Sequence, residues 1–102
     1  METEAVRAVV GAIPKGRWMS YADVVALAGG EPPQAIGLNQ RLTRDETPGA
    51  HRVLKADGSI ANNALGEPEQ MQRKLEREGI RFETGRAAQE KRLSREEAAD
   101  RS

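Results

Sequence analysis

The sequence predicts a mainly α-helical fold, a small winged-helix-like helix-turn-helix domain with a short β-hairpin. Three observations carry this prediction. Apolar residues recur at helical spacing in several short stretches, two of these stretches flank a glycine-containing turn, and an Asp-Gly pair lies between two short apolar runs. The 102 residues suit a single domain, and 37% apolar against 31% charged residues implies a small core under a highly charged surface.

The first two helices are predicted from their caps and stops. The first is expected to begin with Thr3 as its N-cap and to end before Pro14. Between them, apolar residues recur at helical spacing: Val6, Val9, Val10 and Ile13. Ser20 is expected to cap the second helix and to form a weak capping box with Asp23, three residues later. The Gly29-Gly30 pair is expected to end this helix.

A third helix is expected to follow the Pro32-Pro33 pair, because proline is favoured in a first helical turn. Its predicted apolar side consists of Ala35, Ile36, Leu38 and Leu42. Its other side is polar, with Gln34, Asn39, Gln40 and Arg41. Together with the second helix and the glycine pair, this segment fits a helix-turn-helix, a pattern that many small helical domains share.

The second half is expected to contain a hairpin, one helix and a tail. Asp57-Gly58 predicts a hairpin turn between Val53-Leu54 and Ile60. Pro68 is expected to open a helix that has Met71 and Leu75 on one face and that Gly79 stops. From Arg86 the chain is almost purely charged and alanine-rich. We therefore expect a domain over residues 1–84 and a charged, flexible tail over 85–102.

Composition excludes several classes of function. The chain has no cysteine, which rules out disulfides, cysteine-ligated zinc and thiol chemistry. It has one histidine, which rules out a zinc site built on several imidazoles. We expect no metal and no cofactor. The 16 basic and 16 acidic residues balance, so general DNA affinity should be modest and salt-sensitive. No apolar stretch is long enough for a membrane helix, and the acidic start is unlike a signal peptide. We expect a cytoplasmic monomer, nucleoid-associated in a bacterium, with no membrane partner.

Four stretches, in this order and spacing, carry a family resemblance. They are residues 13–21 with Ser20-Tyr21, residues 34–37, residues 48–53 with Ala50-His51-Arg52-Val53, and residues 66–79. Over residues 3–82 the sequence resembles the DNA-binding domain of the alkylguanine-DNA alkyltransferases. Ala50 stands where that family's Pro-Cys-His-Arg-Val motif has its cysteine. The subgroup that lacks this cysteine is the alkyltransferase-like proteins, which bind a lesion without repairing it.

The resemblance implies a non-enzymatic protein that recognises O6-alkylguanine by minor-groove helix insertion and base flipping. It implies DNA contacts from Thr3, Arg17, Ser20, Tyr21, Gln34, Ala35, Gly37, Leu38, Asn39 and Arg41. It implies a lesion pocket lined by Tyr21, Ala50, His51, Arg52, Val53, Ile60, Asn62 and Glu78. Tyr21 would press on a phosphate, and Glu78 would hydrogen-bond to His51. The implied partners are double-stranded DNA, preferentially alkylated, and nucleotide excision repair proteins.

The sequence departs from the family at Gln34, where the family has an intercalating arginine. A glutamine is shorter and neutral, although its amide both donates and accepts hydrogen bonds. Two other functions stay open. One is a winged helix-turn-helix regulator that reads sequence in the major groove without lesion specificity. The other is a related domain that binds protein through its charged tail.

Overall fold

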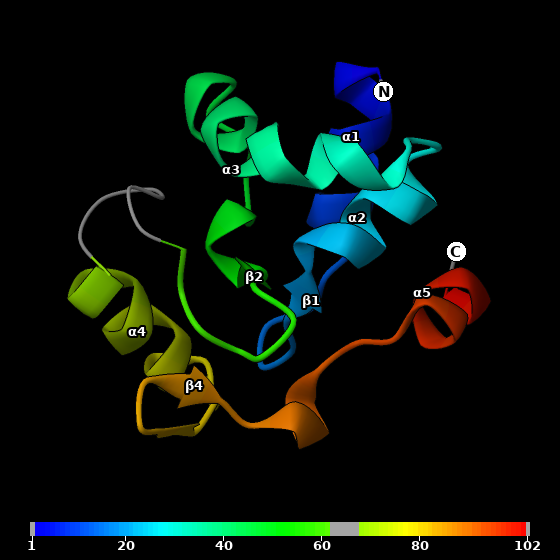
Figure 1. Cartoon of the computed structure of the whole chain (residues 1–102). Helices are drawn as coiled ribbons and strands as arrows, with labels where there is room; N and C mark the ends of the chain where they lie inside the picture. The colour runs from blue at the N-terminus through cyan, green and yellow to red at the C-terminus, as the bar shows by residue number, and fades with distance from the viewer. Residues whose placement is uncertain (1, 62–67, 102) are drawn as a thin grey trace.

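Three helices form the N-terminal half of the computed structural model, which describes residues 2–61 and 68–101 (Figure 1). They are α1 (Thr3–Gly11), α2 (Tyr21–Leu27) and α3 (Ala35–Arg44). Their shared core buries Val6, Val10, Val24, Val25, Leu38 and Leu42. The prediction of a small, mainly helical domain is confirmed. No helix within the described ranges is long and apolar enough to cross a membrane.

Helix α1 begins differently from the prediction. Thr3 is its first helical residue, and Glu2 occupies the N-cap position in extended conformation without a side-chain cap bond. The Thr3 hydroxyl instead accepts a hydrogen bond from Arg41 Nη2 at 3.3 Å. The expectation of Thr3 as the N-cap is therefore wrong, because a tertiary partner uses the hydroxyl that would have capped the helix.

Helix α2 begins at the predicted cap. The Ser20 hydroxyl accepts a hydrogen bond from the Asp23 backbone N–H at 3.2 Å. The Asp23 carboxylate accepts from Arg92 and Arg95. The helix stops at the predicted pair, where Gly29 has a φ of 82°, a backbone conformation that favours glycine.

Helix α3 follows a 3-10 turn, η1 (Pro32–Gln34), as the prolines predict. Leu38 and Leu42 are buried, but Ile36 is 89% exposed. Leu38 and Leu42 are four residues apart and therefore lie on one face of the helix. Ile36 and Leu38 are two residues apart and therefore lie about 200° apart around the helix axis. The assignment of Ile36 to the apolar face was therefore wrong, and its side chain points into solvent.

Two pairs of short strands complete the fold. Strand β1 (Met19–Ser20) pairs in parallel with β2 (Val53–Leu54), with Met19 opposite Val53. Strand β3 (Phe82–Glu83) pairs antiparallel with β4 (Arg86–Ala87). The domain therefore has the short hairpin that its fold class predicts, but the position predicted for it was wrong: Val53-Leu54 pairs with β1 instead of with the segment at Ile60. The Asp57-Gly58 segment does turn, with Gly58 N donating to Lys55 O at 2.8 Å.

Helix α4 (Pro68–Arg77) covers a second, smaller core. Its predicted apolar residues Met71 and Leu75 are both buried, and Gly79 ends the segment with a φ of 101°. This core contains Trp18, Leu54, Leu75, Ile80 and Ala87. A 3-10 turn, η2 (Ala50–Arg52), leads from α3 into β2, so that residues 50–52 lie between the two cores.

The C-terminal segment differs from the predicted solvated tail. After β4 it forms a 3-10 turn, η3 (Gln89–Lys91), and a helix, α5 (Arg95–Arg101), which lies near α2 in Figure 1. Leu93 is fully buried, and its N–H donates to Trp18 O at 2.7 Å. Trp18 Nε1 in turn donates to Ala88 O at 3.0 Å. The division of the chain at residue 84 stays a prediction, but Ala87 and Leu93 contribute to the two cores.

Candidate nucleic-acid interface and base pocket

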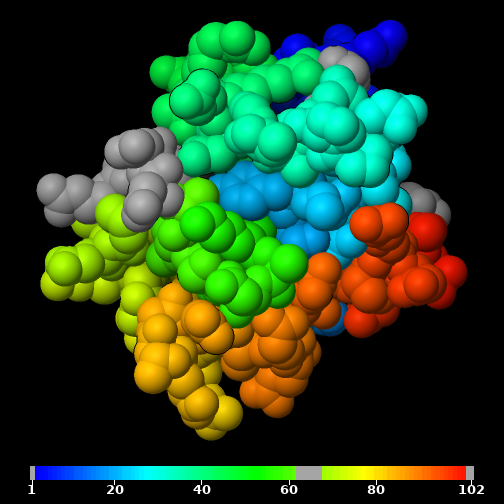
Figure 2. Space-filling view, viewed as in Figure 1, coloured from blue at the N-terminus to red at the C-terminus, as the bar shows by residue number. Residues whose placement is uncertain are grey.

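The outer face of α3 is open to solvent. In the space-filling view, residues 31–44 lie exposed across the upper part of the molecule (Figure 2). A shallow hollow of about 470 Å³ is lined by Gln34, Gly37, Leu38, Gln40, Arg41 and Arg44. Among the described residues, and apart from the backbone of α3 itself and the two chain neighbours, no atom lies within 4 Å of the position that a Cβ on Gly37 would occupy. Packing inside the protein therefore does not require this glycine, and another molecule can approach the α3 backbone closely at this point.

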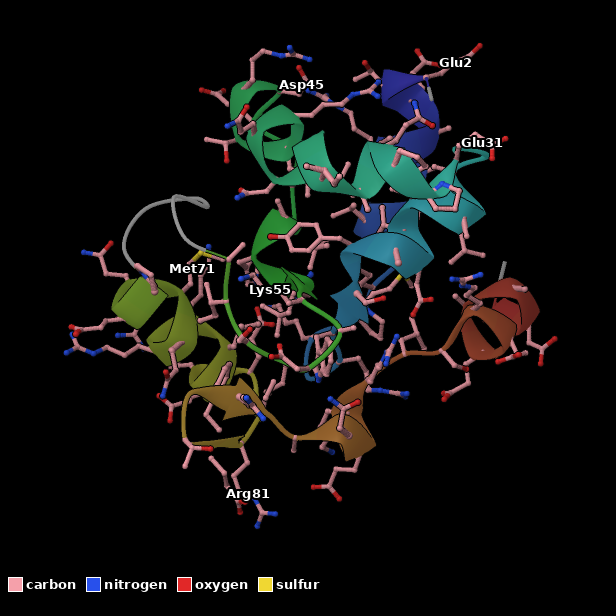
Figure 3. The ribbon with its side chains drawn as sticks, in the orientation of Figure 1. Glu2, Glu31, Asp45, Lys55, Met71 and Arg81 are labelled. Carbon is pink, nitrogen blue, oxygen red and sulfur yellow. The ribbon has the colours of Figure 1, made fainter. Side chains whose placement is uncertain are left out.

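The other predicted α3 residues differ in their access to solvent. Leu38 is only 1% exposed, so its side chain belongs mainly to the core. Ala35 and Asn39 are half-buried. Thr3 and Arg41, which the resemblance also places at DNA, are joined by their hydrogen bond across α1 and α3. Glu31 and Asp45, which flank the segment that contains η1 and α3, are both labelled in Figure 3.

Gln34 is bound to its own helix start. Its Oε1 accepts a hydrogen bond from the Glu31 backbone N–H at 2.7 Å, and the Glu31 side chain accepts from the Gln34 backbone. This reciprocal arrangement is a capping box. The glutamine that replaces the family's intercalating arginine is thus folded back toward Glu31 in this structure.

Arg17 and Ser20 are bound inside the protein. Arg17 donates to the carbonyl oxygens of Lys91 and Arg92, each at 3.0 Å, and pairs with Glu97 at 2.9 Å. Ser20 is fully buried, and its hydroxyl accepts from Arg92 at 3.2 Å as well as capping α2. Both side chains therefore hold the C-terminal segment and α2 together rather than extend from the α3 surface.

Tyr21 is the first residue of α2, directly after the Ser20 cap. Its ring is half-buried against the N-terminal core. Burial raises the pKa of Tyr21 to about 12, so the phenol remains protonated at neutral pH. A neutral phenol can donate a hydrogen bond to a phosphate oxygen.

A buried ionic cluster joins η2 to the end of α4. His51 Nε2 lies 2.9 Å from Glu78 Oε2, which is the contact that the resemblance implies. Arg52 donates to both oxygens of the same carboxylate, through Nε to Oε1 and Nη2 to Oε2, each at 2.9 Å. Arg52 Nη1 also donates to Ile13 O at 3.2 Å. Glu78 therefore fixes both η2 side chains.

The cluster sets the charges of its members. The Arg52 hydrogen bonds are the main reason that the pKa of Glu78 falls to about 2, with a further contribution from His51. Burial of the ring lowers the pKa of His51, although Glu78 opposes this shift. At neutral pH the imidazole is thus neutral, and Nε2–H donates to the carboxylate. This tautomer leaves Nδ1 as a hydrogen-bond acceptor.

A second hollow, of about 430 Å³, lies beside this cluster. Its described lining combines the 43–51 segment with α4: Thr43, Glu46, Thr47, Pro48, Gly49, Ala50, His51, Gln70, Met71 and Lys74. Only Ala50 and His51 come from the predicted pocket set. Polar and apolar side chains share this lining, and Met71 supplies its largest apolar side chain (Figure 3).

The remaining predicted pocket residues lie apart from this described lining. Val53 is fully buried in β2, and Ile60 is half-buried against the second core. Arg52 is engaged by Glu78 and Ile13. Asn62 lies outside the described residues. The α4 residues of the hollow were not predicted as site residues, because the sequence of the Pro68–Arg77 segment indicates only a helix and its core face.

Comparisons with known proteins identify the family of the chain and a similar fold. Residues 2–80 match the family described as "6-O-methylguanine DNA methyltransferase, DNA binding domain". A methylated-DNA–protein-cysteine methyltransferase from Methanothermobacter thermautotrophicus is 37% identical over 75 residues, which are 74% of this chain and 42% of that protein. The chain thus spans less than half the length of that relative. The crystal structure of S. pombe Atl1 with damaged DNA containing O6-carboxymethylguanine has a similar fold. Its TM-score is 0.58 at 24% identity, over 85% of this chain and 90% of that chain.

Proposed function

The chain belongs to the family of the 6-O-methylguanine DNA methyltransferase DNA-binding domain, and from this membership we propose that it binds duplex DNA at O6-alkylguanine without repairing it. One observation carries the proposal. The chain has no cysteine, so the catalytic cysteine of that family is absent, yet the His51–Glu78 pair remains at 2.9 Å. Alkyl transfer to protein needs a soft thiolate nucleophile, which serine and threonine hydroxyls do not replace.

The proposed contacts follow from the two surfaces. Helix α3 lies in the minor groove, with its backbone close to the duplex at Gly37, where no other described part of the chain covers the helix. The lesion is rotated out of the stack toward the hollow lined by Ala50 and His51. Base flipping of this kind exchanges stacking for contacts in a pocket. The Nδ1 acceptor of neutral His51 offers such a contact to a donor on the base.

The protein is expected to have repair partners and a defined location in the cell. Because the chain lacks a thiolate, a bound lesion persists until other proteins remove it, which makes nucleotide excision repair proteins the expected partners. Chromosomal DNA is the expected location, which in a bacterium is the cytoplasmic nucleoid. We expect the protein to act as a monomer.

The first test is fluorescence anisotropy at low salt with two matched duplexes, one plain and one carrying a single O6-methylguanine. We expect binding to the lesion duplex to be tighter by about tenfold, which corresponds to ~1.4 kcal/mol. Equal affinity for both duplexes would reject lesion recognition and favour a general or sequence-reading DNA-binding protein. Absence of binding to either duplex would favour the protein-binding alternative.

Tyr21 provides a second test of the interface. Tyr21→Phe removes only the hydroxyl, so the ring should still pack against the core and the protein should fold normally. A hydrogen bond to a charged partner is worth about 1.5–3 kcal/mol, and we expect lesion affinity to fall by roughly tenfold or more. Unchanged affinity in the same anisotropy titration would place the phosphate contact elsewhere. The control is Phe82→Leu, which changes a half-buried ring of the second core.

A further inference from the structure

Ile36 is unusual among the large apolar side chains that the structure describes, because it alone lies exposed, at 89%. The other large aliphatic residue of the same helical turns, Leu38, is 1% exposed. Ile36 is also β-branched, and such residues are not favoured on a solvent-facing helix surface. Neither packing nor helix propensity therefore accounts for an isoleucine at this position.

The neighbouring Gln34 is poorly placed to fill a gap in DNA. Its amide oxygen accepts from the Glu31 N–H at 2.7 Å and completes the capping box that starts this segment. To reach outward, the side chain must give up that hydrogen bond and leave a helix-start donor without its partner. Ile36 pays no such cost, because its side chain already extends into solvent.

The surroundings of Ile36 match a nucleic-acid duplex. Gly37, the next residue, leaves the helix backbone uncovered. Helix α3 carries Arg41 and Arg44 in its last turn and has no acidic residue between Ala35 and Arg44, and both guanidinium groups also pair with Asp45 just after the helix. An apolar side chain next to a bare backbone, on a helix that carries two guanidinium groups further along, suits stacked bases flanked by phosphates.

We propose that Ile36 is an apolar wedge that enters the base stack of duplex DNA when α3 occupies the groove, and that it takes the space a flipped nucleotide leaves. This inference rests on the proposed function. Apolar side chains are known to insert between base steps in minor-groove complexes. Such a wedge makes no hydrogen bond to the orphaned partner base. Affinity should therefore differ by less than about twofold between lesion duplexes with cytosine or thymine opposite the lesion.

The test compares Ile36→Ala, Ile36→Leu and Gln34→Ala on the O6-methylguanine duplex by anisotropy. A 2-aminopurine beside the lesion reports unstacking as a rise in fluorescence. We expect Ile36→Ala to lose at least fivefold in lesion affinity together with most of the fluorescence rise. Ile36→Leu should retain both, and Gln34→Ala should lose less than Ile36→Ala. Because Ile36 is exposed, both Ile36 variants should unfold at the same temperature as the wild type.

Two results would overturn the wedge while leaving lesion recognition intact. One is wild-type affinity in Ile36→Ala, and the other is a larger loss in Gln34→Ala than in Ile36→Ala. If the wild type binds plain and lesion duplexes equally, the proposed function fails, and 2-aminopurine fluorescence on plain DNA then tests whether Ile36 enters the base stack. A fluorescence rise with the wild type that disappears in Ile36→Ala supports insertion of Ile36, and the absence of a rise with the wild type overturns it. Absence of all DNA binding overturns both.

Discussion

A chain that ends at Thr84 is expected to lose most of the free energy of unfolding of the full protein. The deletion removes Leu93, which is fully buried; even truncating a buried leucine to alanine typically costs about 2–5 kcal/mol. It also takes away the acceptor of Trp18 Nε1. Asp23, whose side chain is only 8% exposed, loses both of its arginine partners. Leaving a buried charge unpaired costs about 3–5 kcal/mol, and the sum is comparable to the ~5–15 kcal/mol that stabilises a typical domain.

Urea unfolding followed by far-UV circular dichroism and by Trp18 fluorescence measures this loss. A chain that ends at Arg95 is the matched control, because it keeps Leu93 and both arginines that bind Asp23. It loses the exposed Arg17–Glu97 pair, and such surface pairs are worth about 0–1 kcal/mol. If the 1–84 chain proves as stable as the full chain, the segment after residue 84 is the solvated tail that its composition predicts.

The predictions that held depend on neighbours in sequence. The Ser20 cap joins residues three apart, and the Met71–Leu75 face and the Gly79 stop follow from one helix. These features need no knowledge of the tertiary structure, since helical periodicity and caps are local. The capping box of Gln34 is also local, because it joins residues three apart, but it was not among the predictions: Glu31 is not one of the usual N-cap residues.

The predictions that failed involve partners far apart in sequence. Arg92 and Arg95 reach Asp23 across 69 and 72 residues, and no pattern in a run of charges and alanines indicates which carboxylate an arginine will meet. Leu93 is a single large apolar residue in that run, and its burial depends on the N-terminal core, whose other buried members all lie before residue 54. Charge density alone predicted solvation, because isolated charges are most often on the surface.

The contacts of the candidate site also join residues that are far apart in sequence. Spacing along the chain does not bring His51 to Glu78, which is 27 residues away; only the family resemblance implied that contact. The bidentate Arg52–Glu78 pair joins residues 26 apart, and nothing in the sequence indicates which carboxylate Arg52 meets. The α4 side of the hollow had no sequence signal, because its polar residues resemble an ordinary solvated helix face.

Glu78→Gln is expected to destabilise the protein strongly while preserving the shape of the side chain. Arg52 and Glu78 have side chains only 13% and 11% exposed, and neutralising the carboxylate leaves the guanidinium buried without its anion. Removing one partner of such a pair costs about 3–5 kcal/mol. Urea denaturation at pH 7 measures the loss. Glu76→Gln, an exposed change on the same helix, is the control and should stay within about 0.5 kcal/mol of the wild type.

The same carboxylate should make stability depend on pH. Its pKa is lowered from 4.5 to about 2 in the folded protein, so its contribution is fully present above pH 4.5 and is lost as the pH falls toward 2. The shift corresponds to about 3 kcal/mol. Wild type should lose this amount between those pH values, whereas Glu78→Gln should lack that part of the dependence and Glu76→Gln should retain it. Identical pH profiles for all three proteins would show that Glu78 is not the anion that fixes His51 and Arg52. In that case the tautomer assigned to His51, and with it the acceptor it offers to a flipped base, would lose its support.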